Sequence, residues 1–212
     1  MSSKQNINWI IANNPVQYEN AISNMNDKVE KILTGCEKEC VWLLEHPSIY
    51  TAGTSSSNDD LLKNTNIPVF WTGRGGKFTY HGPGQRVMYL MMDLRKRDKD
   101  IRLFVKNLEE VIILTLSDFN IQAKRLPGIV GIWVQNKQNE FSKISAIGLR
   151  IRKWVTFHGV SINVYPDLSY YSGIIPCGIK EHGVTSIRNE GVNIKMSEFD
   201  NKLHNNFFKI FK

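Results

Sequence analysis

The chain has 212 residues, of which 42% are hydrophobic and 22% are charged. Its length suits one well-buried domain over residues 1–212, and its composition argues against intrinsic disorder. The longest apolar run, around Val87–Leu94, is too short to cross a bilayer, and residues 1–9 carry no signal-peptide pattern. We therefore expect a cytoplasmic protein that has no membrane partner.

The formal net charge is +7, which favours an acidic partner. The basic residues are scattered along the chain, and no nucleic-acid-binding motif accompanies them. An acidic carrier protein matches this charge as well as a nucleic acid does. Charge alone does not decide between the two kinds of partner.

The first part of the chain predicts a helix, a strand and a loop. Asn14 and Pro15 are favoured at a helix start and Gly35 after a helix end. Between them runs one apolar stripe, made of Tyr18, Ile22, Met25, Val29 and Ile32. Residues 41–44 are expected to form a buried strand that stops before Pro47. The small, polar segment 51–60 predicts a mobile loop.

The rest of the chain alternates strand and helix patterns. Strands are expected at residues 69–72, 85–94 and 154–164, with a hairpin formed by 128–135 and 141–151. A second helix should run from Asp98 or Asp100 to about Phe119, with an inner face of Phe104, Leu108, Val111 and Thr115. A last helix, capped by Ser197 with Asp200 three residues later, should span about 198–211. This order predicts an α+β fold whose sheet carries helices on one face.

The run from Arg74 to Gln85 is the most unusual stretch. Four glycines and a proline stand among side chains that bind or transfer protons, including Arg74, Lys77, Tyr80 and His81. Glycine allows positive φ and close approach of a ligand to the backbone. The spacing matches neither a Walker loop nor a dinucleotide fingerprint. We therefore expect a binding loop of another kind.

Cys177 is the candidate nucleophile, because the proline before it and the glycine after it predict an accessible turn. Its thiol needs a base, for which the candidates are His81, His158, His182 or a desolvated lysine. His182 lies among charged residues and is expected in solvent. Lys143 is surrounded by small and apolar residues, yet lysines on strands usually face solvent. If it points inward, desolvation favours its neutral form, which can act as a base.

Cys36 and Cys40 have the spacing of half a zinc site, but a second close Cys or His pair is missing from the sequence. Both fall at the predicted end of a helix and start of a strand. We therefore expect a structural role for them and no metal site.

Three motifs together resemble the lipoyl(octanoyl) transferase family. They are Arg74–Gln85, Lys143–Gly148 with Trp154–Val164, and Pro176–Gly178 followed by Gly183–Ser186. Glu45–Pro47 and Pro127–Val134 also resemble the family, so the likeness extends from about residue 41 to 188. One departure is segment 51–60, where the family more often carries basic residues.

The resemblance implies a biotin/lipoate protein ligase catalytic-domain fold, with a mixed sheet flanked by helices. It implies an ATP-independent acyltransferase that needs no cofactor or nucleic acid and takes octanoyl from an acyl carrier protein. The acceptors would be lipoyl domains of 2-oxo-acid dehydrogenase acyltransferase subunits and the glycine-cleavage carrier protein. The implied catalytic pair is Cys177, as an acyl-thioester nucleophile, with Lys143. The implied acyl site comprises Arg74, Gly75, Gly76, Lys77, Phe78, Thr79, Tyr80, His81, Ala146, Ile147, Gly148, Gly159, Val160 and Ser161.

Three alternatives stay open at this point. An ATP-dependent lipoate or biotin ligase would share the fold but would not need a nucleophilic cysteine. A cysteine hydrolase would release free acid without an acceptor. A basic nucleic-acid-binding module would leave the settings of Lys143 and Cys177 unexplained.

Overall fold

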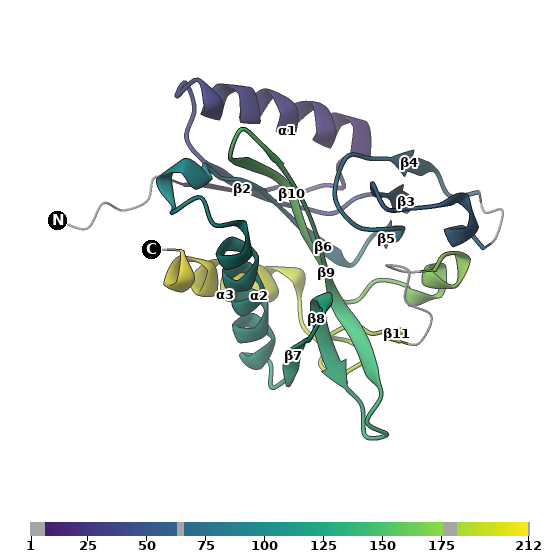
Figure 1. Ribbon diagram of the computed structural model, residues 1–212. Coiled ribbons are helices and arrows are strands. Elements are labelled where there is room, and N and C mark those ends of the chain that lie inside the picture. The colour runs from purple at the N-terminus through teal and green to yellow at the C-terminus, as the bar shows by residue number, and fades with distance from the viewer. Residues whose placement is uncertain (1–6, 63–65, 176–181, 212) are drawn as a thin grey trace.

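A computed structural model describes residues 7–62, 66–175 and 182–211, and a mixed sheet forms its centre (Figure 1). The strands lie in the spatial order β1 (Asn8–Ile11), β2 (Cys40–Leu44), β6 (Gln85–Met91), β10 (Val155–Asn163), β9 (Phe141–Arg152), β8 (Ile129–Gln135) and β7 (Ala123–Leu126), and β11 (Gly183–Val184) pairs with β9. β1 with β2 and β11 with β9 are parallel, and the other neighbours are antiparallel. The predicted hairpin is confirmed as β8 and β9.

A smaller sheet lies beside the main one, in the order β4 (Val69–Trp71), β3 (Ile49–Ala52) and β5 (Thr79–His81). The expected loop at 51–60 is wrong at both ends. Thr51 and Ala52 are buried in β3, and Asn58–Asp60 form a short 3₁₀ helix whose Asp60 carboxylate accepts the Ser57 N–H. The polar composition of the segment gave a wrong prediction, because the Thr51 hydroxyl is hydrogen-bonded inside the protein.

Helices cover both faces of the main sheet, so the expectation of helices on one face is wrong. Helix α1 (Tyr18–Leu33) lies on one face, and α2 (Ile101–Ser117) and α3 (Met196–Ile210) lie on the other (Figure 1). The reason is that the central strands are apolar on both sides. In β2, Val41 and Leu43 pack towards α2 and α3, whereas Cys40 and Leu44 pack towards α1.

The predicted buried faces of the first two helices are confirmed, but the predicted start of the first helix is wrong. Helix α1 begins at Tyr18 with Gln17 as its N-cap, and not at Asn14 and Pro15. The α1 stripe is buried apart from half-buried Ile22, and the predicted inner face of α2 is buried behind an N-cap at Asp100. Helix α3 begins earlier than expected, with Lys195 as N-cap and the Glu198 carboxylate accepting the Lys195 N–H at 2.8 Å. Asp200 is instead buried in a bidentate ion pair with Arg86, at 2.9 and 2.8 Å. No helix in the described ranges is both long and apolar enough to span a membrane.

Candidate active site

A cavity of about 400 Å³ lies where the loop after β4 and strand β5 face strands β9 and β10. This volume falls in the range of roughly 300–1,000 Å³ that is usual for small-molecule sites. Most of the predicted acyl-site residues line it, as does the predicted base: Arg74, Gly75, Gly76, Lys77, Thr79, His81, Lys143, Ala146, Ile147, Gly148, Gly159, Val160 and Ser161. The structure therefore brings together residues that are widely separated in the sequence.

Phe78 and Tyr80 are not among the residues that line the cavity. They are buried in a separate apolar cluster with Tyr50, Ala52 and Ile174. The reason is strand alternation, because Thr79 and His81 of β5 face the cavity and their neighbours face the other way. Both side chains pack on the side of the chain that faces away from the cavity.

The cavity also contains residues that the sequence did not single out as cavity-lining. Tyr18, Val87, Tyr89, Ile129 and Val130 line it as well. Apolar and aromatic residues in strands and helices cannot be distinguished from core residues by periodicity alone. Val130 is 56% exposed although the next four residues of β8 are buried, and only the folded structure reveals this exposure.

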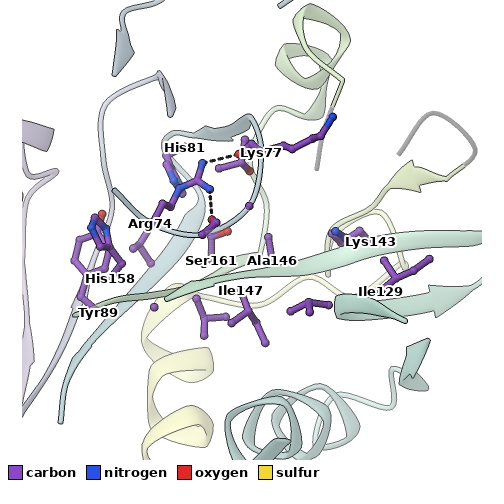
Figure 2. Close-up of a pocket in the computed structure, with 18 of the residues that line it drawn as sticks. Arg74, Lys77, His81, Tyr89, Ile129, Lys143, Ala146, Ile147, His158 and Ser161 are labelled. Carbon is purple, nitrogen blue, oxygen red and sulfur yellow. Dashed lines mark hydrogen bonds between the residues drawn. The ribbon is translucent and has the colours of Figure 1, made fainter. Parts of the chain in front are cut away.

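The two ends of the cavity differ in chemistry. Figure 2 shows Lys143 and Ile129 at one end and Tyr89 and His158 at the other, with Ala146 and Ser161 between them. Ala146 pairs with Ser161 and Gly148 with Gly159 across β9 and β10, so the sheet beneath the cavity carries small side chains. This leaves room for an elongated ligand along the strands.

Arg74 holds the loop over the sheet. Its guanidinium donates to the carbonyl and hydroxyl oxygens of Thr51, both at 2.7 Å. It also donates to the carbonyls of Gly75 and Lys77, both at 2.9 Å (Figure 2). A Cβ atom on Gly148 would lie 3.1 Å from Arg74 Cδ and 3.3 Å from the Gly75 oxygen. Glycine at this position therefore allows the loop to approach β9 closely.

Lys143 points into the cavity and is only 8% exposed, so the usual solvent-facing position does not apply. A β-bulge is the cause. Ile132 of β8 pairs with Ser145 of β9, but the next residue, Trp133, pairs with Lys143, which leaves Ile144 as the extra residue. Ile144 packs into the core on the α2 side, and Lys143 is turned to the cavity face. Its Nζ lies 4.7 Å from the centroid of the Trp133 ring.

The buried histidines beside the cavity are neutral at pH 7. Burial, with a smaller contribution from nearby charges that include Arg74, lowers the pKa of both His81 and His158 to about 3. His81 Nδ1 lies 2.6 Å from Gln85 Oε1, which can only accept, so Nδ1 carries the proton. His158 has φ of +59° inside a strand, a conformation that is uncommon for a residue with a side chain. Such weak bases are poorly matched to proton abstraction near pH 7.

A third histidine, His46, is hydrogen-bonded to Tyr89, which lines the cavity. His46 Nδ1 donates to the Val16 carbonyl at 2.6 Å, so Nε2 accepts from the Tyr89 hydroxyl at 2.7 Å. Burial lowers the pKa of His46 to about 4. The chain of bonds fixes the Tyr89 ring at the end of the cavity remote from Lys143.

Cys177 lies outside the described residues, which stop at Ile175 and resume at His182. Each flank is linked to a residue that lines the cavity. The Ile175 N–H donates to the carbonyl of Asp60, whose side chain pairs with Lys77, and Val184 of β11 pairs with Lys143. His182 is half-buried against Trp133 and Phe141, so its expected solvent position is wrong.

The other two cysteines lie in different environments. Cys40 is buried in β2, where burial raises its thiol pKa to about 11, and Cys36 is exposed. Across the described ranges, no group of three or more His, Cys, Asp or Glu side chains is arranged to hold a metal ion. The thiol of Cys40 therefore behaves as an apolar core group.

Comparison with known proteins gives consistent matches. The family model described as "Lipoyl protein ligase A/B catalytic domain" matches residues 18–208. A protein of Rhodospirillum rubrum named octanoyltransferase is 52% identical over 203 residues, which are 96% of this chain and 94% of that protein. An octanoyltransferase of Ehrlichia canis is 52% identical over 206 residues, covering 97% of this chain and 96% of its own length.

A solved structure with the same fold is the bipartite lipoate protein ligase of Thermoplasma acidophilum. It superposes with a TM-score of 0.70, covers 96% of this chain and 83% of its own, and is 16% identical in sequence. The expected fold, a mixed sheet flanked by helices as in lipoate and biotin ligases, is confirmed.

Proposed function

Because this chain belongs to the lipoyl protein ligase A/B catalytic-domain family, we propose that it is an octanoyltransferase acting in protein lipoylation. It would form a single catalytic domain over residues 1–212. The donor is an octanoyl acyl carrier protein, and the acceptor is a lysine of a lipoyl domain in 2-oxo-acid dehydrogenase subunits or the glycine-cleavage carrier. The observation that carries this proposal is a buried lysine at one end of an elongated cavity, in a chain 52% identical to proteins named octanoyltransferase.

The octanoyl tail lies along β9 and β10, over Ala146, Gly148, Gly159 and Ser161. Small side chains there leave the volume for a hydrocarbon chain. Burying about seven methylenes at about 0.8 kcal/mol each contributes several kcal/mol to binding. The wall at Tyr89 ends the channel and sets the preferred chain length.

In the first step, Lys143 acts as the base and its amine removes the thiol proton of Cys177. The thiolate attacks the carbonyl carbon of the donor thioester, the carrier sulfur leaves, and it takes the proton back from Lys143. The products are an S-octanoyl enzyme and free carrier thiol. This assignment is supported by the inward direction of Lys143 and by the two flanks of segment 176–181. Ile175 is linked to the cavity through Asp60 and Lys77, and Val184 through its pairing with Lys143.

In the second step, the neutral amine of the acceptor lysine attacks the S-octanoyl carbonyl. The Cys177 sulfur leaves as a thiolate, an amide bond forms, and the proton lost by the amine passes through Lys143 to the thiolate. Thioester exchange is nearly balanced in free energy and amide formation is downhill, so no nucleotide is required. His81 and His158 are too weakly basic for this role, and as neutral rings they serve as fixed hydrogen-bonding groups.

The decisive experiment is intact-mass analysis after the protein is mixed with octanoyl acyl carrier protein in the absence of ATP. We expect an octanoyl adduct that hydroxylamine removes, and its loss in Cys177→Ser. Cys36→Ser is the matched control, because Cys36 is an exposed free thiol and should leave the adduct intact. An undiminished adduct in Cys177→Ser would refute the assigned nucleophile.

The same mixture separates the remaining alternatives. An adduct or product that forms only with ATP and free acid would indicate a ligase, and free octanoate without an acceptor would indicate a hydrolase. The net charge of +7 should also speed encounter with an acidic carrier. The acylation rate at low donor concentration should therefore fall as salt is raised, and a flat response would refute electrostatic steering.

A further inference from the structure

We propose that Trp133 is a positioning residue, which acts through Lys143 by holding its amine at the reactive end of the cavity. This inference rests on the proposed function, in which Lys143 is the base. Trp133 and Lys143 are directly paired across β8 and β9, so their side chains lie on the same face of the sheet. The Lys143 Nζ lies over the Trp133 ring, 4.7 Å from its centroid, so the amine and the indole are in contact.

The stem of Lys143 is held as well as its amine. Gly131 is in β8, two residues before Trp133 and on the same face, with φ of +123°. A Cβ at this position would lie 3.2 Å from Lys143 Cε and 2.9 Å from the Ser145 carbonyl oxygen. The absence of a side chain at Gly131 therefore provides the space that the Lys143 stem occupies. The bulge at Ile144 directs the stem towards this space.

No hydrogen bond from the Nε1–H of Trp133 to any residue that the structure describes fixes the position of its indole ring. Trp133 is 1% exposed, and its Nε1 has no hydrogen-bond partner among the described residues. A buried indole N–H usually has a partner, and leaving it unpaired is unfavourable. The position of the ring is therefore set by packing contacts, which include those with Lys143 and His182.

This arrangement matters because a base must lie within hydrogen-bond reach of the thiol that it deprotonates. Lysine has four rotatable side-chain bonds, and an unrestrained amine samples many positions. A misplacement of about 1 Å can slow a reaction by about 100-fold. Gly131, the bulge and the Trp133 ring together restrict the amine to one end of the cavity.

A double-mutant cycle tests the inference through the rate of acyl-enzyme formation. Trp133→Leu should slow acylation by about 10- to 100-fold with little change in the donor concentration at half-saturation, whereas Trp133→Phe, which keeps a ring, should stay within about 3-fold of wild type. In a Lys143→Met background, Trp133→Leu should have almost no further effect. Equal losses in both backgrounds would show a purely structural role and overturn the inference.

Lys124→Met is the matched control, because it removes a lysine–aromatic contact of the same hairpin, Lys124 over Phe141 at 4.6 Å, and leaves Phe141 in place against His182. It should leave the acylation rate unchanged.

A second readout does not depend on activity. In NMR spectra of lysine-labelled protein, the Lys143 ε-methylene should show a ring-current shift that Trp133→Leu removes and Trp133→Phe retains. If wild type forms no acyl-enzyme, the proposed function fails. If the ring-current shift is absent, the contact itself fails, so the two failures are distinguishable.

Discussion

Replacing Lys143 by methionine removes the proposed base while leaving its packing largely in place. Methionine has a stem of similar length, and its sulfur packs favourably on an aromatic ring such as Trp133. Loss of a general base should slow acylation by about 100- to 10,000-fold. A volume-conserving change at this buried position should cost less than about 1.5 kcal/mol of unfolding free energy, or no more than about 6 °C in Tm for a chain of this size. Activity should therefore fall far more than stability.

The assay is single-turnover acylation followed by intact mass, with Tm measured on the same samples. Lys143→Arg is the informative second variant, because arginine keeps the positive charge but does not release a proton at accessible pH. If Lys143 is the base, both variants are slow; if it only stabilises the thiolate by its charge, arginine restores much of the rate. Lys124→Met is the control, since Lys124 contacts an aromatic ring outside the cavity. A rate for Lys143→Met within 3-fold of wild type, taking about 3-fold as the resolution of such assays, would refute the reasoning.

Three further predictions follow from other parts of the structure. Shortening the donor from octanoyl to hexanoyl removes two buried methylenes, so kcat/KM should fall by about 15-fold, and equal rates would exclude a fitted channel. Burial lowers the pKa of His46 to about 4 and of His81 and His158 to about 3, so below pH 6.5 the unfolded chain binds protons that the folded chain does not. Stability should thus be complete above pH 6.5 and fall by on the order of 2 kcal/mol for each histidine at pH 5; an unchanged urea midpoint would contradict this. Arg86→Met leaves the buried carboxylate of Asp200 without its partner and should lower the unfolding free energy by about 3–5 kcal/mol. Adding Asp200→Leu to this variant should largely recover the loss in urea titrations, and equal midpoints for the single and double variants would argue against the pair.

Local pattern was sufficient for most elements and for the binding loop. The apolar stripe of α1 repeats every three or four residues because a helix turns with that period, and the β8–β9 hairpin follows from two apolar runs around a polar turn. The loop from Arg74 was recognisable because its glycines and charged residues are unusual together. These features depend on residues that are close together in the sequence, so they can be predicted from the sequence alone.

The direction of Lys143 was decided only by the tertiary structure. Alternation along β9 places Leu149 and Ile151 against the core, and by the same count Lys143 would lie there and Ile144 in the cavity. The bulge reverses this order, and it exists because β9 pairs with β8 in a shifted register. Alternation places Tyr80 and His81 on opposite sides of β5, but which of the two sides meets the cavity likewise depends on which distant strands become neighbours. Pairing between strands is a property of the folded chain, and no window of local sequence determines it.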